Sequence, residues 1–197
     1  MALAQELTDH IEAIRGTIAG SSAVIDDIVA KVCECFGRGG KILICGNGGS
    51  AADAQHFAAE FMNRMRIDRG PWPAIALSTD SSVLTSIAND ASFADVFARQ
   101  VRGLGQPGDM LFAISTSGGA ANVLAAISAA RGRGMSTVGF TGEAGAETMG
   151  VDCDLLLVVP SRVTARIQEC HEFVYHVIAG MVEKQLVERG FRGDEGQ

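Results

Sequence analysis

The stretch KILICGNGGSAADAQHFAAEF, residues 41–61, decides the fold class of this chain. It opens with an apolar, β-rich run, passes through a glycine-rich turn and continues with apolar residues at helical spacing. A strand that leads through a tight turn into a helix is the opening unit of a parallel α/β sheet. The stretch therefore predicts a buried strand, a turn and a helix that packs on the sheet.

Similar strand patterns recur along the chain. Short apolar or β-branched runs begin at Ala74, Met110, Ser136 and Leu155, with helical stretches between them. A last long periodic segment covers about residues 163–188. This alternation favours a parallel sheet with helices on both faces, so we expect a three-layer αβα fold.

The N-terminal segment, residues 1–38, has apolar residues at helical spacing with a break near Gly20–Ser22. It predicts two extra helices. They precede residues 40–188, which contain the core of the fold and the C-terminal helix. A chain of 197 residues that is 47% hydrophobic can bury one sizeable core. We therefore expect one domain over 1–197, with a flexible polar tail at 189–197.

Charge and composition exclude several classes of partner. The formal net charge is −7, the opposite of the basic surface that nucleic acid requires, so no direct nucleic-acid partner is expected. The sequence shows no signal peptide and no apolar run of membrane-spanning length, which predicts a cytoplasmic protein without a membrane partner. The five cysteines lie mainly in apolar segments without paired CxxC motifs, as expected for reduced, buried thiols.

Two loops resemble each other. GNGGSAADA (46–54) follows the first predicted strand and STSGGAANV (115–123) follows the third. In an open parallel sheet such loops lie beyond the carboxyl ends of strands, where helix N-termini offer free N–H groups. Their hydroxyls and glycine N–H groups suit a phosphate monoester, although each loop alone could reflect ordinary helix capping. Neither loop has the Walker pattern, and a nucleotide cofactor is not favoured.

Four motifs carry a resemblance to a known family: CGNGGSAADAQHFAAEF, SIAND (86–90), AISTSGGAANV and SRVTARIQECHEFVYH (161–176). On these motifs the chain resembles the SIS (sugar isomerase) domain, and more closely the phosphoheptose isomerases. The resemblance implies a flavodoxin-like five-stranded parallel sheet and a homotetramer with active sites near subunit interfaces. It also implies isomerisation of sedoheptulose 7-phosphate to D-glycero-D-manno-heptose 7-phosphate, an early step of heptose biosynthesis, through an enediol(ate) intermediate.

The resemblance also assigns roles to residues. It implies one zinc ion per subunit, with Glu60 as the base at carbon and His176 as the acid that moves protons on the sugar oxygens. The implied zinc ligands are His56, Glu60, Gln168 and His176. The implied substrate contacts are Asn47, Gly48, Gly49, Ser50, Glu60, Asn89, Asp90, Ser115, Thr116, Ser117 and Gln168.

Helical spacing agrees with part of this assignment. His56 and Glu60 are four residues apart, so they face the same way and can share a ligand. Gln168 and His176 are eight residues apart and can meet only on something held between them. Each of these residues alone could be structural, and we expect His10 and His171 to be structural.

The chain departs from the pattern of this family at two positions. Many relatives have serine where this chain has Ala120, and some have an acidic residue at Ala165, which bears on phosphate affinity or substrate preference. A non-catalytic tetrameric SIS protein that binds the bacterial replication initiator is the main alternative. Such proteins are expected to lack an acid–base group at Glu60 or His176, and both are present here. A sugar-phosphate-sensing or amino-sugar-processing SIS protein is the second alternative.

Overall fold

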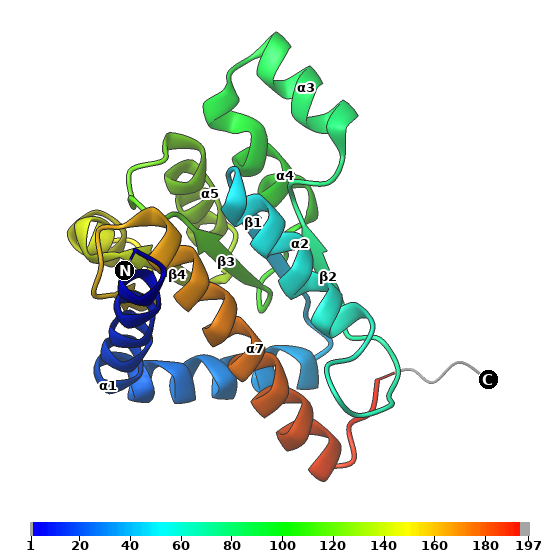
Figure 1. The fold of residues 1–197 in the computed structure, drawn as a ribbon. Coiled ribbons are helices and arrows are strands. Elements are labelled where there is room, and N and C mark those ends of the chain that lie inside the picture. Colours follow the sequence, from blue (N-terminus) through cyan, green and yellow to red (C-terminus); the bar gives the residue numbers. More distant parts are fainter. Residues whose placement is uncertain (1, 194–197) are drawn as a thin grey trace.

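The computed structural model describes residues 2–193 as a three-layer αβα fold around one parallel sheet (Figure 1). The strand order is β2-β1-β3-β4-β5, which confirms the predicted fold class. The strands are β1 (Ile42–Gly46), β2 (Ala74–Ala76), β3 (Met110–Ile114), β4 (Ser136–Gly142) and β5 (Leu155–Val159). The α-helices are α1 (Ala2–Gly37), α2 (Gly49–Met62), α3 (Ser81–Asp90), α4 (Val96–Leu104), α5 (Ala121–Gly132), α6 (Ala146–Gly150) and α7 (Thr164–Glu188), with short 3-10 turns at Phe93–Asp95 and Glu143–Gly145.

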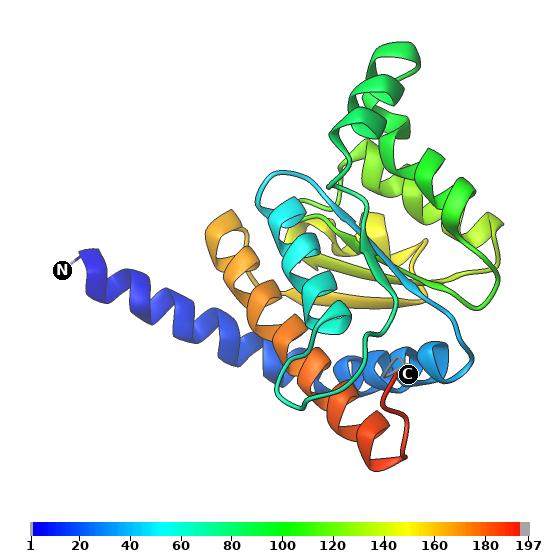
Figure 2. The same ribbon diagram turned by 90° about the vertical axis from the view of Figure 1, so that its right-hand side faces the viewer.

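The central strands are apolar on both faces because helices cover both. In β1, Ile42 and Ile44 join one hydrophobic cluster, whereas Leu43 and Cys45 join another. Helices α1, α2 and α7 supply the first cluster, and α3 to α6 supply the second. The two groups of helices lie on opposite sides of the sheet in Figure 2. Fully buried parallel strands of this kind read as continuous apolar runs, which is why the sequence revealed them.

The expectation of two N-terminal helices was wrong. The structure has a single helix from Ala2 to Gly37 that runs through Gly20–Ser22. Figures 1 and 2 show that its dark blue half and its lighter blue half point in different directions. The Ser22 hydroxyl donates to the carbonyl of Ile18 at 2.5 Å, and such bonds to the preceding turn bend helices. The polar residues therefore mark a change of direction in one helix.

The loop between α2 and β2 is held by the C-terminal half of α7. Glu183 accepts hydrogen bonds from three successive backbone N–H groups of this loop, and Arg69 pairs with it at 3.2 Å. Phe191, in the segment expected to be a flexible tail, stacks on Trp72 with ring centroids 6.2 Å apart. The rest of that expected tail, residues 194–197, lies outside the described residues. The helices among residues 2–193 include none with the length and apolar character to cross a membrane.

Candidate active site

The two glycine-serine loops meet at the centre of the sheet. They follow β1 and β3, which are neighbouring strands whose connections leave in opposite directions. The side-chain amides of Asn47 and Asn122 join the loops, because each donates to the other at 2.8 Å. A crevice between such strands is the usual ligand site of an open α/β sheet. The structure thus brings both predicted phosphate loops to one place.

Both loops leave hydrogen-bond donors free for an anion. Helix α2 begins after Gly48 and helix α5 after Ala120, and neither cap residue makes a side-chain capping bond. Their first backbone N–H groups are therefore available, together with the positive end of each helix dipole. Ser50 and Ser115 are buried in the loops, Thr116 is half-buried and Ser117 is exposed.

Glycine is needed at two points of these loops. Gly48 has a φ of 57°, and Gly118 has a φ of 68° with its Cβ position only 2.3 Å from the Cα of Gly145. A side chain at either position would strain the backbone, and at Gly118 it would also clash. The loop shapes therefore depend on these glycines.

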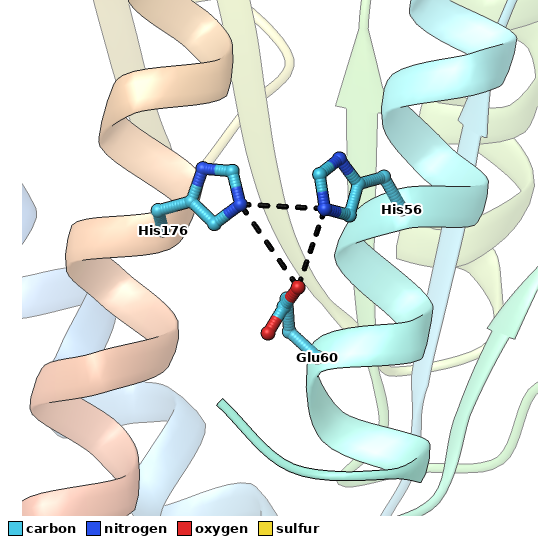
Figure 3. A group of neighbouring side chains, drawn as sticks. All are labelled: His56, Glu60 and His176. Carbon is cyan, nitrogen blue, oxygen red and sulfur yellow. Dashed lines mark hydrogen bonds and ion pairs between the residues drawn. The ribbon is translucent and has the colours of Figure 1, made fainter. Parts of the chain in front are cut away.

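A second group of predicted residues converges between α2 and α7. His56 and Glu60 point from α2 toward His176 on α7 (Figure 3). The Nε2 atom of His56 lies 3.3 Å from Glu60 Oε1 and 3.4 Å from His176 Nε2. His176 Nε2 lies 3.9 Å from Glu60 Oε1. Three of the four predicted zinc ligands thus face a common point.

The spacing of these three atoms fits a zinc ion. Zinc bonds of about 2.0–2.2 Å place the ligand atoms of a tetrahedral site about 3.3–3.6 Å apart. Two of the three separations fall in that range, and the third is slightly longer. Two imidazoles and one carboxylate form a ligand set typical of catalytic zinc, in which one position stays open for water or substrate. The donor chemistry and the geometry therefore agree.

The other nitrogen of each histidine also has a partner. His176 Nδ1 donates to the backbone carbonyl of Glu172 at 2.8 Å, so its Nε2 is left as the acceptor or ligand atom. His56 Nδ1 lies 2.9 Å from the hydroxyl of Tyr175. Hydrogen bonds of this kind orient metal-binding histidines.

Two titratable side chains, Asp53 and Tyr175, lie close to His56. Burial raises the pKa of the Asp53 carboxyl to about 6, and the charge of Glu172 adds to the rise while His56 opposes it. The buried Oδ2 atom of Asp53 has no hydrogen-bond partner among the described residues. Burial also raises the pKa of the Tyr175 phenol, with the charges of Glu172 and Asp53 in support, so this group stays protonated near neutral pH.

Three remaining predicted residues lie apart from the cluster of His56, Glu60 and His176. Gln168 lies in the second turn of α7, and its amide lies against Gly49, so that a Cβ on that glycine would come within 2.3 Å of it. Gln168 is thus placed beside the glycine-serine loop that follows β1, at the opposite end of α2 from Glu60. Asn89 and Asp90 lie exposed at the end of α3, which projects from the domain in Figure 1, and they bond to each other at 2.8 Å.

The residues expected to be structural lie elsewhere. His171 is fully buried and packs against the Phe140 ring at a tilt, and burial lowers its pKa to about 4. His10 pairs with Glu169 at 2.7 Å. All five cysteines are free, and four of them are buried.

Sequence reasoning missed three residues near these sites: Asn122, Asp53 and Tyr175. Asn122 and Asp53 occur within the quoted motifs, but helical or loop position alone did not separate them from their neighbours. Tyr175 precedes His176, and adjacent helical residues point in different directions. Its contact with His56 arises from the packing of α7 on α2, which the sequence does not display.

The chain is similar to known proteins both in sequence and in structure. The SIS domain family model matches residues 5–142. The chain is 55% identical over 183 residues to a phosphoheptose isomerase of Roseiflexus sp., covering 93% of this chain and 92% of the relative. It is 50% identical over 170 residues to a phosphoheptose isomerase of Desulfovibrio desulfuricans, covering 86% and 80%. The solved phosphoheptose isomerase of Neisseria gonorrhoeae superposes with a TM-score of 0.86 at 40% identity, covering 93% of this chain and 97% of that one.

Proposed function

Because the chain belongs to the phosphoheptose isomerase family of SIS-domain enzymes, we propose that it isomerises sedoheptulose 7-phosphate to D-glycero-D-manno-heptose 7-phosphate in heptose biosynthesis. The observation that carries the proposal is the convergence of His56, Glu60 and His176 between α2 and α7, with the start of α2 forming part of the phosphate loops. A ketose–aldose isomerase needs a phosphate anchor, a base at carbon and an acid at oxygen. The two groups of residues supply these parts.

The phosphate end of the sugar binds at the loops after β1 and β3. The hydroxyls of Ser50, Ser115, Thr116 and Ser117 and the free N–H groups that open α2 and α5 surround the phosphate with neutral donors. Asn47, Gly48, Gly49 and Gln168 line the same loops, and we assign them to substrate binding as well. Asn89 and Asp90 belong to the proposed substrate set by motif position.

The proton transfers take place at the cluster. Glu60 removes the proton from the carbon next to the carbonyl. His176, which enters this step with a proton on each ring nitrogen, gives the Nε2 proton to the carbonyl oxygen, and this yields an enediol. Glu60 then returns a proton to the neighbouring carbon while His176 takes the proton from the other oxygen. The hydrogen bond from His176 Nδ1 to the Glu172 carbonyl keeps its Nε2 atom directed at the substrate.

We assign His56, Glu60 and His176 as ligands of one zinc ion per subunit, whereas the Gln168 amide, which lies beside Gly49 and away from these three residues, is assigned to substrate binding alone. His176 Nε2 can bind zinc only when it carries no proton, so it serves as ligand and as acid in turn. When bound there, zinc supplies Lewis-acid polarisation of the sugar carbonyl. The Glu60 carboxylate has two oxygens, so one can bind the metal while the other takes the proton from carbon.

Helix α1 supports the proposal of a homotetramer. Leu3, Leu7, Ile11 and Ile18 repeat at helical spacing along it and are between 36% and 84% exposed. An apolar stripe of this length is typical of an interface between proteins. Light scattering at micromolar concentration is expected to show four chains, and a monodisperse monomer would refute it. We place the enzyme in the cytoplasm, where phosphorylated sugars are made.

The test of the function is direct. Purified protein with sedoheptulose 7-phosphate should produce an aldose phosphate that NMR detects. Glu60→Gln keeps the shape of the side chain but removes the base, and turnover is expected to fall by roughly 10²–10⁴-fold. Glu147→Gln is the matched control, because Glu147 is exposed on α6, on the other face of the sheet.

Zinc content has to be measured beside turnover, since Glu60 is also a proposed ligand. His176→Gln tests the acid in the same way. If both variants keep wild-type turnover at normal zinc content, the acid–base assignment is wrong. The non-catalytic protein that binds the replication initiator then becomes the better interpretation.

A further inference from the structure

Tyr175 is buried in the interface between α2 and α7, directly behind His56. Its side chain is 1% exposed, and its ring stacks on Phe57 with centroids 5.2 Å apart. Its hydroxyl reaches His56 Nδ1 at 2.9 Å. It is also the only tyrosine in the chain, so any tyrosine signal from this protein reports on this one hydroxyl.

The partner of Nδ1 decides what the other ring nitrogen of His56 can do. A neutral imidazole carries one proton, so Nε2 can bind a metal only when Nδ1 holds that proton. The one ion pair that this nitrogen makes among residues 2–193 is with the half-exposed Glu172 carboxylate, at 3.8 Å. That distance is too long for a hydrogen bond. Tyr175 is therefore the group in position to hold the ring.

We infer that Tyr175 is a positioning residue that sets the orientation and tautomer of His56, and through them the affinity of the site for zinc. The inference rests on the proposed role of His56 as a zinc ligand. A phenol suits this task because it can both donate and accept a hydrogen bond.

This property distinguishes His56 from His176. The backbone carbonyl that binds His176 Nδ1 can only accept, so it holds that ring in one tautomer. The 2.9 Å contact fits a hydrogen bond in which His56 Nδ1–H donates to the phenol oxygen, and this tautomer leaves His56 Nε2, 3.3 Å from Glu60 Oε1, free to bind a metal. With zinc on Nε2, the neutral ring would keep its proton on Nδ1, and the phenol oxygen would accept a hydrogen bond from it.

The first experiment measures zinc affinity by competition with a chromophoric chelator. Tyr175→Phe keeps the stacked ring and removes only the hydroxyl, so the fold is expected to survive. Loss of such a partner typically lowers metal affinity by about 10–100-fold, and we expect the zinc Kd to rise in that range. Thr141→Val is the matched control, because it also removes a fully buried hydroxyl. Unlike the Tyr175 hydroxyl, this one has no hydrogen-bond partner among the described residues. Its Kd should stay within about 2-fold of wild type.

Glu172→Gln tests the rival partner of His56. A large rise in Kd for this variant together with an unchanged Kd for Tyr175→Phe would overturn the inference. The inference requires a larger rise in Kd for Tyr175→Phe than for Glu172→Gln. Melting temperatures of the metal-free proteins show whether a change in Kd reflects unfolding instead.

The second experiment needs no metal, so it separates this inference from the proposed function. The ¹⁵N shifts of His56 in the metal-free wild type should show one tautomer with its proton on Nδ1, and Tyr175→Phe should give a mixture. Identical His56 shifts in the two proteins would overturn the inference even if the wild type binds zinc. If the wild type binds no zinc but the shifts differ, the zinc assignment fails and the hold of Tyr175 on His56 stands.

A fluorotyrosine label gives a third measurement on the unmutated sequence. The protein made with 3-fluorotyrosine should show one ¹⁹F resonance, which belongs to residue 175. Addition of one equivalent of zinc should shift it, because the imidazole that is hydrogen-bonded to this hydroxyl becomes a metal ligand. A resonance that stays in place while zinc binds would overturn the link between Tyr175 and the zinc site.

Discussion

Replacing Glu183 with glutamine is expected to destabilise the protein more than any other single loss of charge in the α2–α7 layer. The Glu183 carboxylate is 1% exposed and Arg69, its ion-pair partner, is 0% exposed. The Arg69 guanidinium also lies 3.7 Å from the centre of the Trp72 ring and donates to the carbonyl of Glu60 at 2.8 Å. The remaining donors to Glu183 are the backbone N–H groups of Met65, Arg66 and Ile67, at 2.8–2.9 Å.

The magnitude follows from this burial. A glutamine keeps one acceptor oxygen but turns an NH₂ group toward backbone donors, and it leaves the buried Arg69 charge without its partner. Breaking a buried ion pair on one side costs about 3–5 kcal/mol. For a chain of this size each kcal/mol lowers the melting temperature by roughly 2–4 °C, so a decrease of roughly 6–20 °C is expected. The end of α2 that carries Glu60 should also loosen, because Arg69 binds its carbonyl.

Urea denaturation and calorimetry of the metal-free proteins provide the measurement. Glu188→Gln is the matched control, since Glu188 is exposed on the same helix and its loss should change stability by less than about 0.5 kcal/mol. In a double-mutant cycle, Arg69→Met should cost much less in the Glu183→Gln background than in the wild type. A loss below about 1 kcal/mol for Glu183→Gln, or strictly additive effects in the cycle, would refute the reasoning.

Three further predictions concern the loops and a buried histidine. Gly49→Ala should push the Gln168 amide away and raise the KM. Stability should change little, because the new Cβ would meet only the flexible end of the Gln168 side chain, at 2.3 Å. An unchanged KM would remove Gln168 from substrate binding. Ser115→Ala should raise the KM for the phosphorylated sugar about 10-fold or more while kcat changes less, since a hydrogen bond to a charged group contributes about 1.5–3 kcal/mol. A KM equal to that of the wild type would contradict the phosphate assignment. Burial lowers the pKa of His171 to about 4, so between pH 6.5 and about 4 the unfolded chain binds a proton that the folded chain does not. Stability should therefore fall as the pH drops through this window, by up to about 3 kcal/mol, and a His171→Gln variant with the same slope as wild type would show that another group is responsible.

Much of the fold could be predicted from the sequence because its signals are local. Most of the strands are short apolar runs, and most are followed by glycine, proline or polar residues that do not continue them. The two loops could be recognised because glycine and hydroxyl residues follow equivalent strands. His56 and Glu60 could be paired because four residues make about one helical turn. The break expected near Gly20–Ser22 was wrong because packing of α1 overrides weak helix propensity.

Only the tertiary structure decided which distant residues meet. His176 contacts His56 on α2, Asn47 bonds to Asn122, and Glu183 binds the loop after α2. Each of these contacts joins segments more than 70 residues apart. Their partners depend on the strand order and on the angle at which α7 crosses α2, and neither leaves a periodic trace in the sequence. Tyr175 is the clearest case, because a tyrosine in an apolar helix reads as core until the packing brings its hydroxyl to His56. The local sequence thus determined the elements and their ligand-bearing ends, while the chemistry of the cluster came from side chains that only packing brings together.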